Sequence, residues 1–178
     1  HVLETLKKSK KIKKIIVATT KNSEDDIIEN WCIKNNYEVF RGPEDNVLLR
    51  YYKAAQENNL KYILRVTGDD PFKDFNLIDT AIHIMLNGNF DLVTNVFPPS
   101  YPEGLDIELL KFSCLETITL SAFSEFEKEH VTQYIYKNFK QFKIHNMKNE
   151  IKQSHIRLTV DTKDDIKFFK KIDFFLSK

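Results

Sequence analysis

Cysteine is scarce in this chain of 178 residues, and its two cysteines form no motif. Cys32 and Cys114 stand far apart among apolar neighbours, with no CxxC pair and no Cys/His spacing of the kind that binds zinc. A disulfide framework and a structural zinc site are therefore excluded. Two reduced, packed thiols are typical of the cytosol, so we expect a cytoplasmic protein.

Net charge and long apolar runs are lacking too. The 27 Lys and Arg residues face 26 Asp and Glu residues, so no polybasic surface for nucleic acid is predicted, and a charged ligand must be met by local side chains. No run of about 18 apolar residues occurs, which argues against a membrane span. The basic stretch Lys7–Lys14 precedes only the short run Ile15–Thr20, which is not the core of a signal peptide. We expect neither nucleic acid nor a membrane as a partner.

The signatures of nucleophilic and zinc hydrolases are also missing. No Ser/His/Asp arrangement and no HExxH motif is evident. His130 follows Glu129 on an expected helix, and His155 stands alone before Ile156. A lone histidine is more often structural than catalytic, so we discount hydrolase chemistry.

Short β-branched runs alternate with helical patterns from one end of the chain to the other. This alternation predicts one α/β domain over residues 1–178, built around a mainly parallel sheet. Apolar residues at helical spacing, as in 77–85 and 166–175, predict the helices between the strands. The expected strands are Ile15–Thr20, Tyr37–Phe40, Tyr62–Thr67, Asp91–Val96 and Ile156–Val160.

The segment 97–150 differs from the rest. Prolines and Gly104 interrupt it, and it then contains the helix-like stretches Ser113–Leu120 and Glu127–Phe139. We expect an arm, inserted between two strands of the sheet, that binds a substrate or forms a dimer. Its aromatic residues suit either a homodimer contact or burial within the monomer, and the sequence leaves both open: Phe123, Phe126, Tyr134, Tyr136 and Phe139.

Two aspartates directly follow expected strands. The run Tyr62–Thr67 leads into Gly68-Asp69-Asp70-Pro71, and Ile156–Val160 leads into Asp161-Thr162. Ligands of open parallel sheets bind beyond the carboxyl ends of the strands. Two carboxylates from two strand exits suit a hard cation such as Mg²⁺, with positions left for phosphate and water. We therefore expect Asp69 and Asp161 to lie side by side and to bind Mg²⁺.

Other interpretations of these aspartates stay open. Spacing alone equally allows Asp69 and Asp161 to cap turns. A single aspartate at a strand end also fits the phospho-acceptor of a receiver-like signalling domain, although the early acidic pair and the late strand-end lysine of such domains are not evident.

Two further segments contain candidate binding residues. Arg41 and Arg50 lie on either side of Asp45, where an expected strand gives way to a helix. A guanidinium makes two parallel hydrogen bonds to phosphate or carboxylate, but an exposed arginine often only solvates a surface. Glu103 and Asp106 flank a glycine turn, where they would bind the hydroxyls of a polyol or serve the turn alone.

These motifs, taken in order, resemble those of one known family. It is the spore-coat polysaccharide biosynthesis cytidylyltransferases (SpsF-like), relatives of the acylneuraminate and 3-deoxy-manno-octulosonate cytidylyltransferases. The resemblance covers nearly the whole chain. It rests on Val17–Thr20 with Asp25–Ile27, Phe40–Gly42 with Asp45, Val47–Leu48 and Arg50–Tyr52, Thr67–Pro71, Tyr101–Asp106, Glu129–Thr132 and Thr159–Thr162.

The resemblance implies a Rossmann-like nucleotidyltransferase fold, a three-layer sandwich. It also implies transfer of CMP from CTP to a sugar or sugar acid, with release of pyrophosphate, in surface polysaccharide biosynthesis. By motif, Asp69 and Asp161 correspond to the catalytic aspartates that bind Mg²⁺. The residues that fall near the nucleotide are Arg41, Asp45, Arg50 and Gly68, and those near the acceptor are Glu103, Asp106, Glu129 and His130.

The chain departs from the family at its start. Family members begin with a strand and a glycine- and arginine-rich loop that ends in a lysine and wraps the triphosphate, and no such segment precedes His1. The first residues, 1–6, fall in the middle of an amphipathic helical pattern without a cap. We therefore expect a truncated chain that lacks this strand and loop and binds triphosphate weakly. The alternative function is a non-catalytic nucleotide- or sugar-binding module of the same fold.

Overall fold

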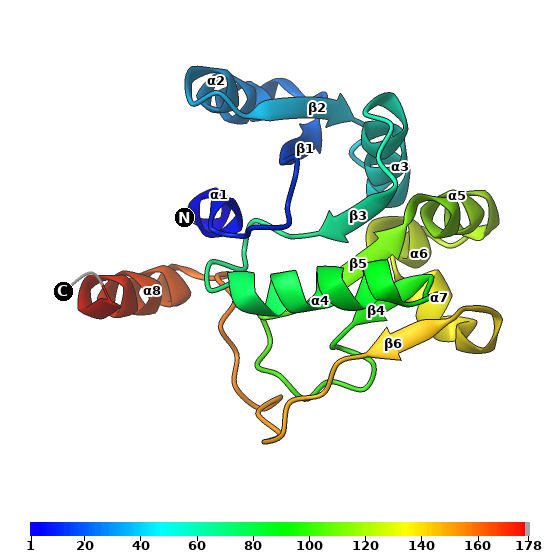
Figure 1. Ribbon diagram of the computed structural model, residues 1–178. Helices are drawn as coiled ribbons and strands as arrows, with labels where there is room; N and C mark the ends of the chain where they lie inside the picture. The colour runs from blue at the N-terminus through cyan, green and yellow to red at the C-terminus, as the bar shows by residue number, and fades with distance from the viewer. Residues whose placement is uncertain (177–178) are drawn as a thin grey trace.

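The computed structural model describes residues 1–176 (Figure 1). Its strands are β1 (Ile16–Thr20), β2 (Glu38–Gly42), β3 (Tyr62–Arg65), β4 (Leu92–Thr94), β5 (Glu108–Lys111) and β6 (Ile144–Asn146). Its helices are α1 (Val2–Lys7), α2 (Asp26–Lys34), α3 (Val47–Glu57), α4 (Phe75–Asn87), α5 (Phe112–Ser121), α6 (Glu125–Glu129), α7 (Gln133–Lys137) and α8 (Lys163–Leu176), with short 3-10 turns at Ser23–Asp25 and Phe139–Gln141. Over residues 1–176, no helix is long and apolar enough to cross a bilayer.

The strands form two groups. β1 and β2 pair in parallel, with Ile16 opposite Glu38. The other four form one sheet in the order β3-β5-β4-β6, in which β5 is antiparallel to both neighbours and β4 and β6 are parallel. Among the described residues, β1 pairs only with β2 and β3 only with β5. The α/β class is confirmed, but the larger sheet is mixed because β5 enters it in the opposite direction.

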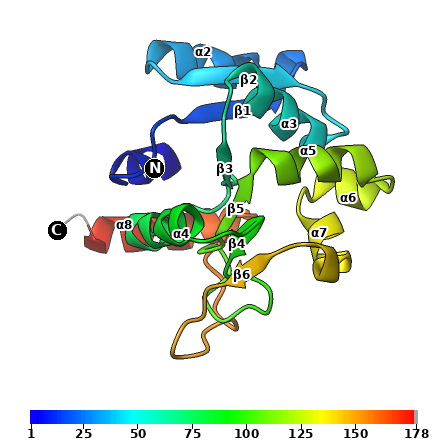
Figure 2. The same ribbon diagram turned by 45° about the vertical axis from the view of Figure 1, so that its right-hand side comes forward.

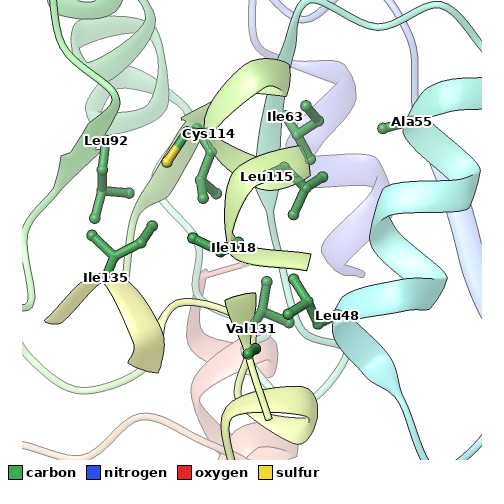
Figure 3. Close-up of a cluster of buried hydrophobic side chains, with 11 residues drawn as sticks. Leu48, Ala55, Ile63, Leu92, Cys114, Leu115, Ile118, Val131 and Ile135 are labelled. Atoms are coloured by element: carbon green, nitrogen blue, oxygen red, sulfur yellow. The ribbon is translucent and has the colours of Figure 1, made fainter. Parts of the chain in front are cut away.

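Helices cover both faces of the larger sheet (Figure 2). Successive side chains of a strand point to opposite faces. On β4, Leu92 accordingly packs with α3, α5 and α7, whereas Val93 packs with α1 and α4. On β5, Leu110 and Leu109 divide between the same two clusters. Figure 3 shows the first cluster, in which the labelled side chains of α5 lie between those of α3 on one side and Leu92 and Ile135 on the other. Two cores separated by one sheet make a three-layer sandwich, as expected.

The segment 156–160 is not the regular strand that the sequence predicts. It makes a single parallel bridge, between Arg157 and Glu103. The opposing chain turns away after that residue, because Leu105 N–H donates to the carbonyl of Pro102 at 3.1 Å and Gly104 has φ +97°. A side chain at position 104 would also lie 3.1 Å from the backbone of Leu158. The close approach of the two chains at this point therefore requires glycine.

The predicted arm, 97–150, is partly built into the sheet, since it contributes β5 and β6. The helix expected over Glu127–Phe139 is broken into α6 and α7, because Val131 has φ +44° and its side chain is buried in the core between them. Of the five aromatic residues, Tyr134 and Tyr136 pack against the core of the monomer. The others are exposed: Phe123, Phe126 and Phe139. A homodimer stays a prediction.

Candidate functional site

A polar pocket of about 300 Å³ lies where β3 ends and β5 begins. These two antiparallel strands place Arg65 directly opposite Glu108. The loop after β3, the turn before β5, the break between α6 and α7, and the chain before α8 supply the remaining walls. The lining residues are Arg65, Thr67, Asp69, Asp70, Lys73, Val96, Glu103, Asp106, Glu108, His130, Thr132, Gln133, Tyr136 and Thr159.

The pocket carries an excess of negative charge. Five of its lining side chains are carboxylates, whereas lysine and arginine contribute only Lys73 and Arg65. Each cation already has a carboxylate partner. Asp69, Glu103 and Asp106 make no ion pair with any side chain within residues 1–176. A polyphosphate would meet electrostatic repulsion here unless a cation came with it.

Lys73 and Asp70 form a buried ion pair at the base of the pocket. Lys73 Nζ lies 2.7 Å from Asp70 Oδ2, and the two side chains are only 2% and 7% exposed. Lys73 Nζ also donates to the carbonyl of Asp106 at 2.7 Å, and Thr67 Oγ1 donates to Asp70 Oδ2 at 3.0 Å. The pair therefore ties the loop after β3 to the turn before β5.

Glu108 is the centre of a second buried network. Its Oε2 accepts from Arg65 Nη1 at 2.6 Å, and its Oε1 accepts from the Tyr136 hydroxyl at 2.7 Å and from Thr132 Oγ1. Burial, reinforced by the charge of Glu108, raises the pKa of Tyr136 far above its usual value. The hydroxyl thus stays protonated and donates to Glu108.

The strand-exit segments that contain Asp69 and Asp161 lie next to each other. Val160 N–H donates to the carbonyl of Asp69 at 2.8 Å. On the other side, the ring of Phe169 on α8 packs on that of Phe72, with centroids 5.3 Å apart. These contacts hold the start of α8 beside the loop that follows β3.

The carboxylate of Asp161 is held by two neighbouring side chains. It accepts from Arg157 Nη1 at 2.8 Å and from Thr159 Oγ1 at 2.7 Å, and its side chain is 54% exposed. No cluster of three or more His, Cys, Asp or Glu side chains with metal-binding geometry occurs in the described part of the chain. Magnesium commonly takes only one or two carboxylates, with phosphate and water completing its shell. Asp69 lines the pocket, whereas Asp161 is not among its lining residues. Binding of Mg²⁺ by these two aspartates stays a prediction.

Three of the other predicted site residues line the pocket, and a fourth adjoins a lining residue. Glu103, Asp106 and His130 line it together with Asp69, and Gly68 precedes Asp69 with nothing within 4 Å of the position that a Cβ would take. His130 reaches the pocket because the chain turns sharply at the break between α6 and α7. By contrast, Glu129 is exposed at the end of α6 and is not among the lining residues.

The predicted nucleotide-binding residues of β2 and α3 lie outside the pocket lining. Arg41 is held by the carboxylates of Asp26 and Glu29 and by two backbone carbonyls, and so joins β2 to the start of α2. Arg50 Nη1 donates to the carbonyl of Pro43 at 2.9 Å, and Asp45 is exposed in the loop before α3. Their nucleotide-binding role stays a prediction.

Several polar residues of the pocket escaped the sequence analysis. Arg65 and Glu108 are charged residues next to apolar strand residues, and Lys73 directly follows Phe72. A charge inside an apolar run must be paired when it is buried. A charged residue in an apolar strand sequence therefore indicates a buried ion pair, and this pattern would have pointed to Arg65 and Glu108. Thr132 and Tyr136 carried no such signal, because their role depends on where Glu108 lies.

Asp106 gives the pocket a pH-dependent effect on stability. Burial raises the pKa of this carboxyl; Asp70, Glu108 and Glu103 act in the same direction, and Lys73 opposes them. Because the folded-state pKa lies above the unfolded one, the ionised form costs stability at neutral pH, and the cost disappears as both states become protonated. We expect Asp106→Asn to raise Tm at pH 7, with a gain that shrinks as the pH approaches about 4. Thermal unfolding of both proteins from pH 7 to pH 4 measures this. A gain that is constant or grows toward acid pH would contradict it.

The fold is the first point of comparison with known proteins. The three-layer α/β sandwich is the Rossmann-like fold of solved nucleotidyltransferase structures. CMP:2-keto-3-deoxy-manno-octonic acid synthetase, solved in complex with CTP, shares the fold with a TM-score of 0.66 at 10% identity, over 99% of this chain and 86% of that one.

The sequence comparisons narrow the class further. The cytidylyltransferase family matches residues 1–175, and the chain belongs to that family. A cytidylyltransferase structure from Leptospira borgpetersenii is similar over 95% of this chain and 72% of its own, with 35% identity and a TM-score of 0.90.

Two curated relatives agree with this assignment. The uncharacterised protein MJ1063 of Methanocaldococcus jannaschii is 40% identical over 94% of this chain and 69% of its own length. The spore coat polysaccharide biosynthesis protein SpsF of Bacillus subtilis is 32% identical over 89% of this chain and 66% of its own. The chain thus spans about two thirds of the length of both relatives.

Proposed function

We propose that this protein transfers CMP from CTP to a sugar or sugar acid, releasing pyrophosphate, and that the product serves surface polysaccharide synthesis. Membership of the cytidylyltransferase family supports the reaction class. The similarity to SpsF, named for spore coat polysaccharide biosynthesis, supports the pathway. The structural observation that carries the proposal is the hydrogen bond from Val160 N–H to the carbonyl of Asp69, which joins the segments that contain the two aspartates. Asp69 and Thr159 line the pocket, and Asp161 follows Val160 in the chain.

In the proposed reaction, an acceptor hydroxyl attacks the α-phosphorus of CTP. A bond forms between the acceptor oxygen and phosphorus, the bond to the pyrophosphate oxygen breaks, and the hydroxyl proton passes to a base, for which Asp106 is the proposed residue. Asp69 and Asp161 would hold Mg²⁺, which supplies positive charge for the phosphoryl oxygens when bound. The excess of carboxylates around the pocket makes such a counter-charge necessary.

The acceptor would lie at the wall formed by Glu103, Asp106 and His130, with Glu129 nearby in the chain. Carboxylates accept hydrogen bonds from sugar hydroxyls and so orient them for attack. Asp106 suits proton acceptance better than an ordinary carboxylate, because burial raises its pKa. The residues proposed to bind the nucleotide are Arg41, Asp45, Arg50 and Gly68.

The test is a screen of the full-length protein for pyrophosphate release. Each of the four nucleoside triphosphates is paired, in the presence of Mg²⁺, with a panel of sugars, sugar acids and sugar phosphates. We expect release with CTP and with one acceptor class. Calorimetric binding of CTP without release for any acceptor would instead identify a non-catalytic module. Release that favours a purine triphosphate would contradict the proposal.

A further inference from the structure

We propose that Arg65 is the oxyanion-binding side chain of the pocket, and that Glu108, Thr132 and Tyr136 hold it in position for that purpose. The ligand would be a phosphate or carboxylate oxygen, supplied either by the nucleotide or by the acceptor. This inference rests on the proposed function, because it assigns a substrate contact within the same pocket.

Of the two cations in the pocket lining, Arg65 is the one with a donor group left free for a ligand by the described residues. Lys73, the other cation of the pocket, is 2% exposed and already contacts Asp70 and the carbonyl of Asp106. Arg65 is 21% exposed and lines the pocket. It makes one hydrogen bond within residues 1–176, from Nη1 to Glu108, and its enclosed Nε has no partner among them. The Nη2 group is therefore left to bind a ligand.

The guanidinium of Arg65 is also fixed in position. Glu108 cannot easily turn away, because Oε1 is held by two hydroxyl donors while Oε2 binds Arg65. Thr132 is buried, and the ring of Tyr136 stacks on that of Phe97 with centroids 4.9 Å apart. A guanidinium held in this way loses little freedom when it binds an oxyanion.

The turn at Val131, which brings the donor Thr132 to Glu108, has a strained backbone. Val131 has φ +44°, a conformation that a β-branched residue rarely adopts and that costs about 1–3 kcal/mol. The turn puts Thr132 against Glu108 and His130 at the pocket wall. Strain of this kind gathers at functional sites, where it fixes side chains that a regular helix would direct elsewhere.

The experiment compares ligand binding by the wild type and the double variant Arg65→Met/Glu108→Gln. Removing both partners avoids a buried, unpaired carboxylate, and thermal unfolding verifies that the variant is folded. Calorimetry uses CTP with Mg²⁺, 2-keto-3-deoxy-manno-octonic acid as a sugar acid, and mannose as a neutral sugar. Lys128→Met removes a cation outside the pocket lining and serves as the control.

We expect the affinity for one oxyanion probe to fall roughly 10- to 100-fold in the double variant. A loss for CTP alone assigns the contact to a nucleotide phosphate, and a loss for the sugar acid alone assigns it to the acceptor. Thr132→Val and Tyr136→Phe, which keep the guanidinium, should each raise the KM of the affected substrate more than they lower kcat. Arg65→Lys should restore part of the binding.

Two outcomes separate this inference from the proposed function. If the wild type turns over CTP and the folded double variant binds every probe within twofold of wild type, the role of Arg65 is refuted and the reaction stands. If the wild type binds an oxyanion through Arg65 but releases no pyrophosphate, the reaction is refuted and the binding role stands. A wild type that binds neither oxyanion probe contradicts both.

Discussion

Replacing Asp69 or Asp161 with asparagine is expected to lower CTP turnover by at least about 10²–10³-fold while leaving the protein folded. Asparagine keeps the size of the side chain but removes the charge that would hold Mg²⁺. The carboxylate of Asp69 has no ion pair within residues 1–176, and that of Asp161 is exposed and paired only with Arg157. Folding therefore depends little on either charge.

Pyrophosphate release, followed alongside thermal unfolding, measures this prediction. Asp164→Asn is the matched control, because Asp164 is an exposed aspartate at the start of α8, three residues after Asp161. Its ion-pair partner is Lys167. We expect the control to retain wild-type turnover. Wild-type turnover in either Asp69→Asn or Asp161→Asn would reject the metal assignment.

Lys73→Met is expected to lower the free energy of unfolding by about 3–5 kcal/mol, because it leaves the carboxylate of Asp70 buried without its cation. For a chain of this size each kcal/mol lowers Tm by about 2–4 °C. Lys167→Met is a control with matched geometry. Both lysines pair with an aspartate three residues earlier, at 2.7 Å and 2.8 Å, but the Lys167 pair is exposed. Its loss should change stability by less than about 1 kcal/mol.

The double variant Lys73→Met/Asp70→Asn isolates the cause. With both charges removed, much of the lost stability should return, because the buried carboxylate is gone. Chemical unfolding of the single and double variants measures the difference. If Lys73→Met lowers the free energy of unfolding no more than Lys167→Met does, burial does not determine the contribution of the Lys73–Asp70 pair to stability.

The sequence predicts the parts of this fold that depend on local patterns. Alternating short strands and amphipathic helices indicate the three layers, because burial on one face imposes a period on the residues themselves. Helix α8 is one example: the apolar spacing of 166–175 predicts it, and the helix spans Lys163–Leu176. The pattern does not predict the direction of β5, whose apolar run is the same in either orientation.

The candidate site divides in a similar way. Asp69 is predicted from the sequence because it comes two residues after an expected strand, although β3 itself ends at Arg65. Arg65 and Glu108 are not, since their meaning depends on the antiparallel register that puts them opposite each other. The break at Val131 is hidden as well, because the helical pattern of 127–139 continues through it and only tertiary packing makes the chain turn there.

The proposed reaction requires the carboxylates of Asp69 and Asp161 to act together on one divalent cation. Electron paramagnetic resonance of Mn²⁺, titrated into the CTP-bound full-length protein, measures this cooperation. We predict that each asparagine variant weakens Mn²⁺ binding strongly and that the double variant weakens it by little more than one substitution alone. Mn²⁺ binding of wild-type strength in the double variant would contradict the claim.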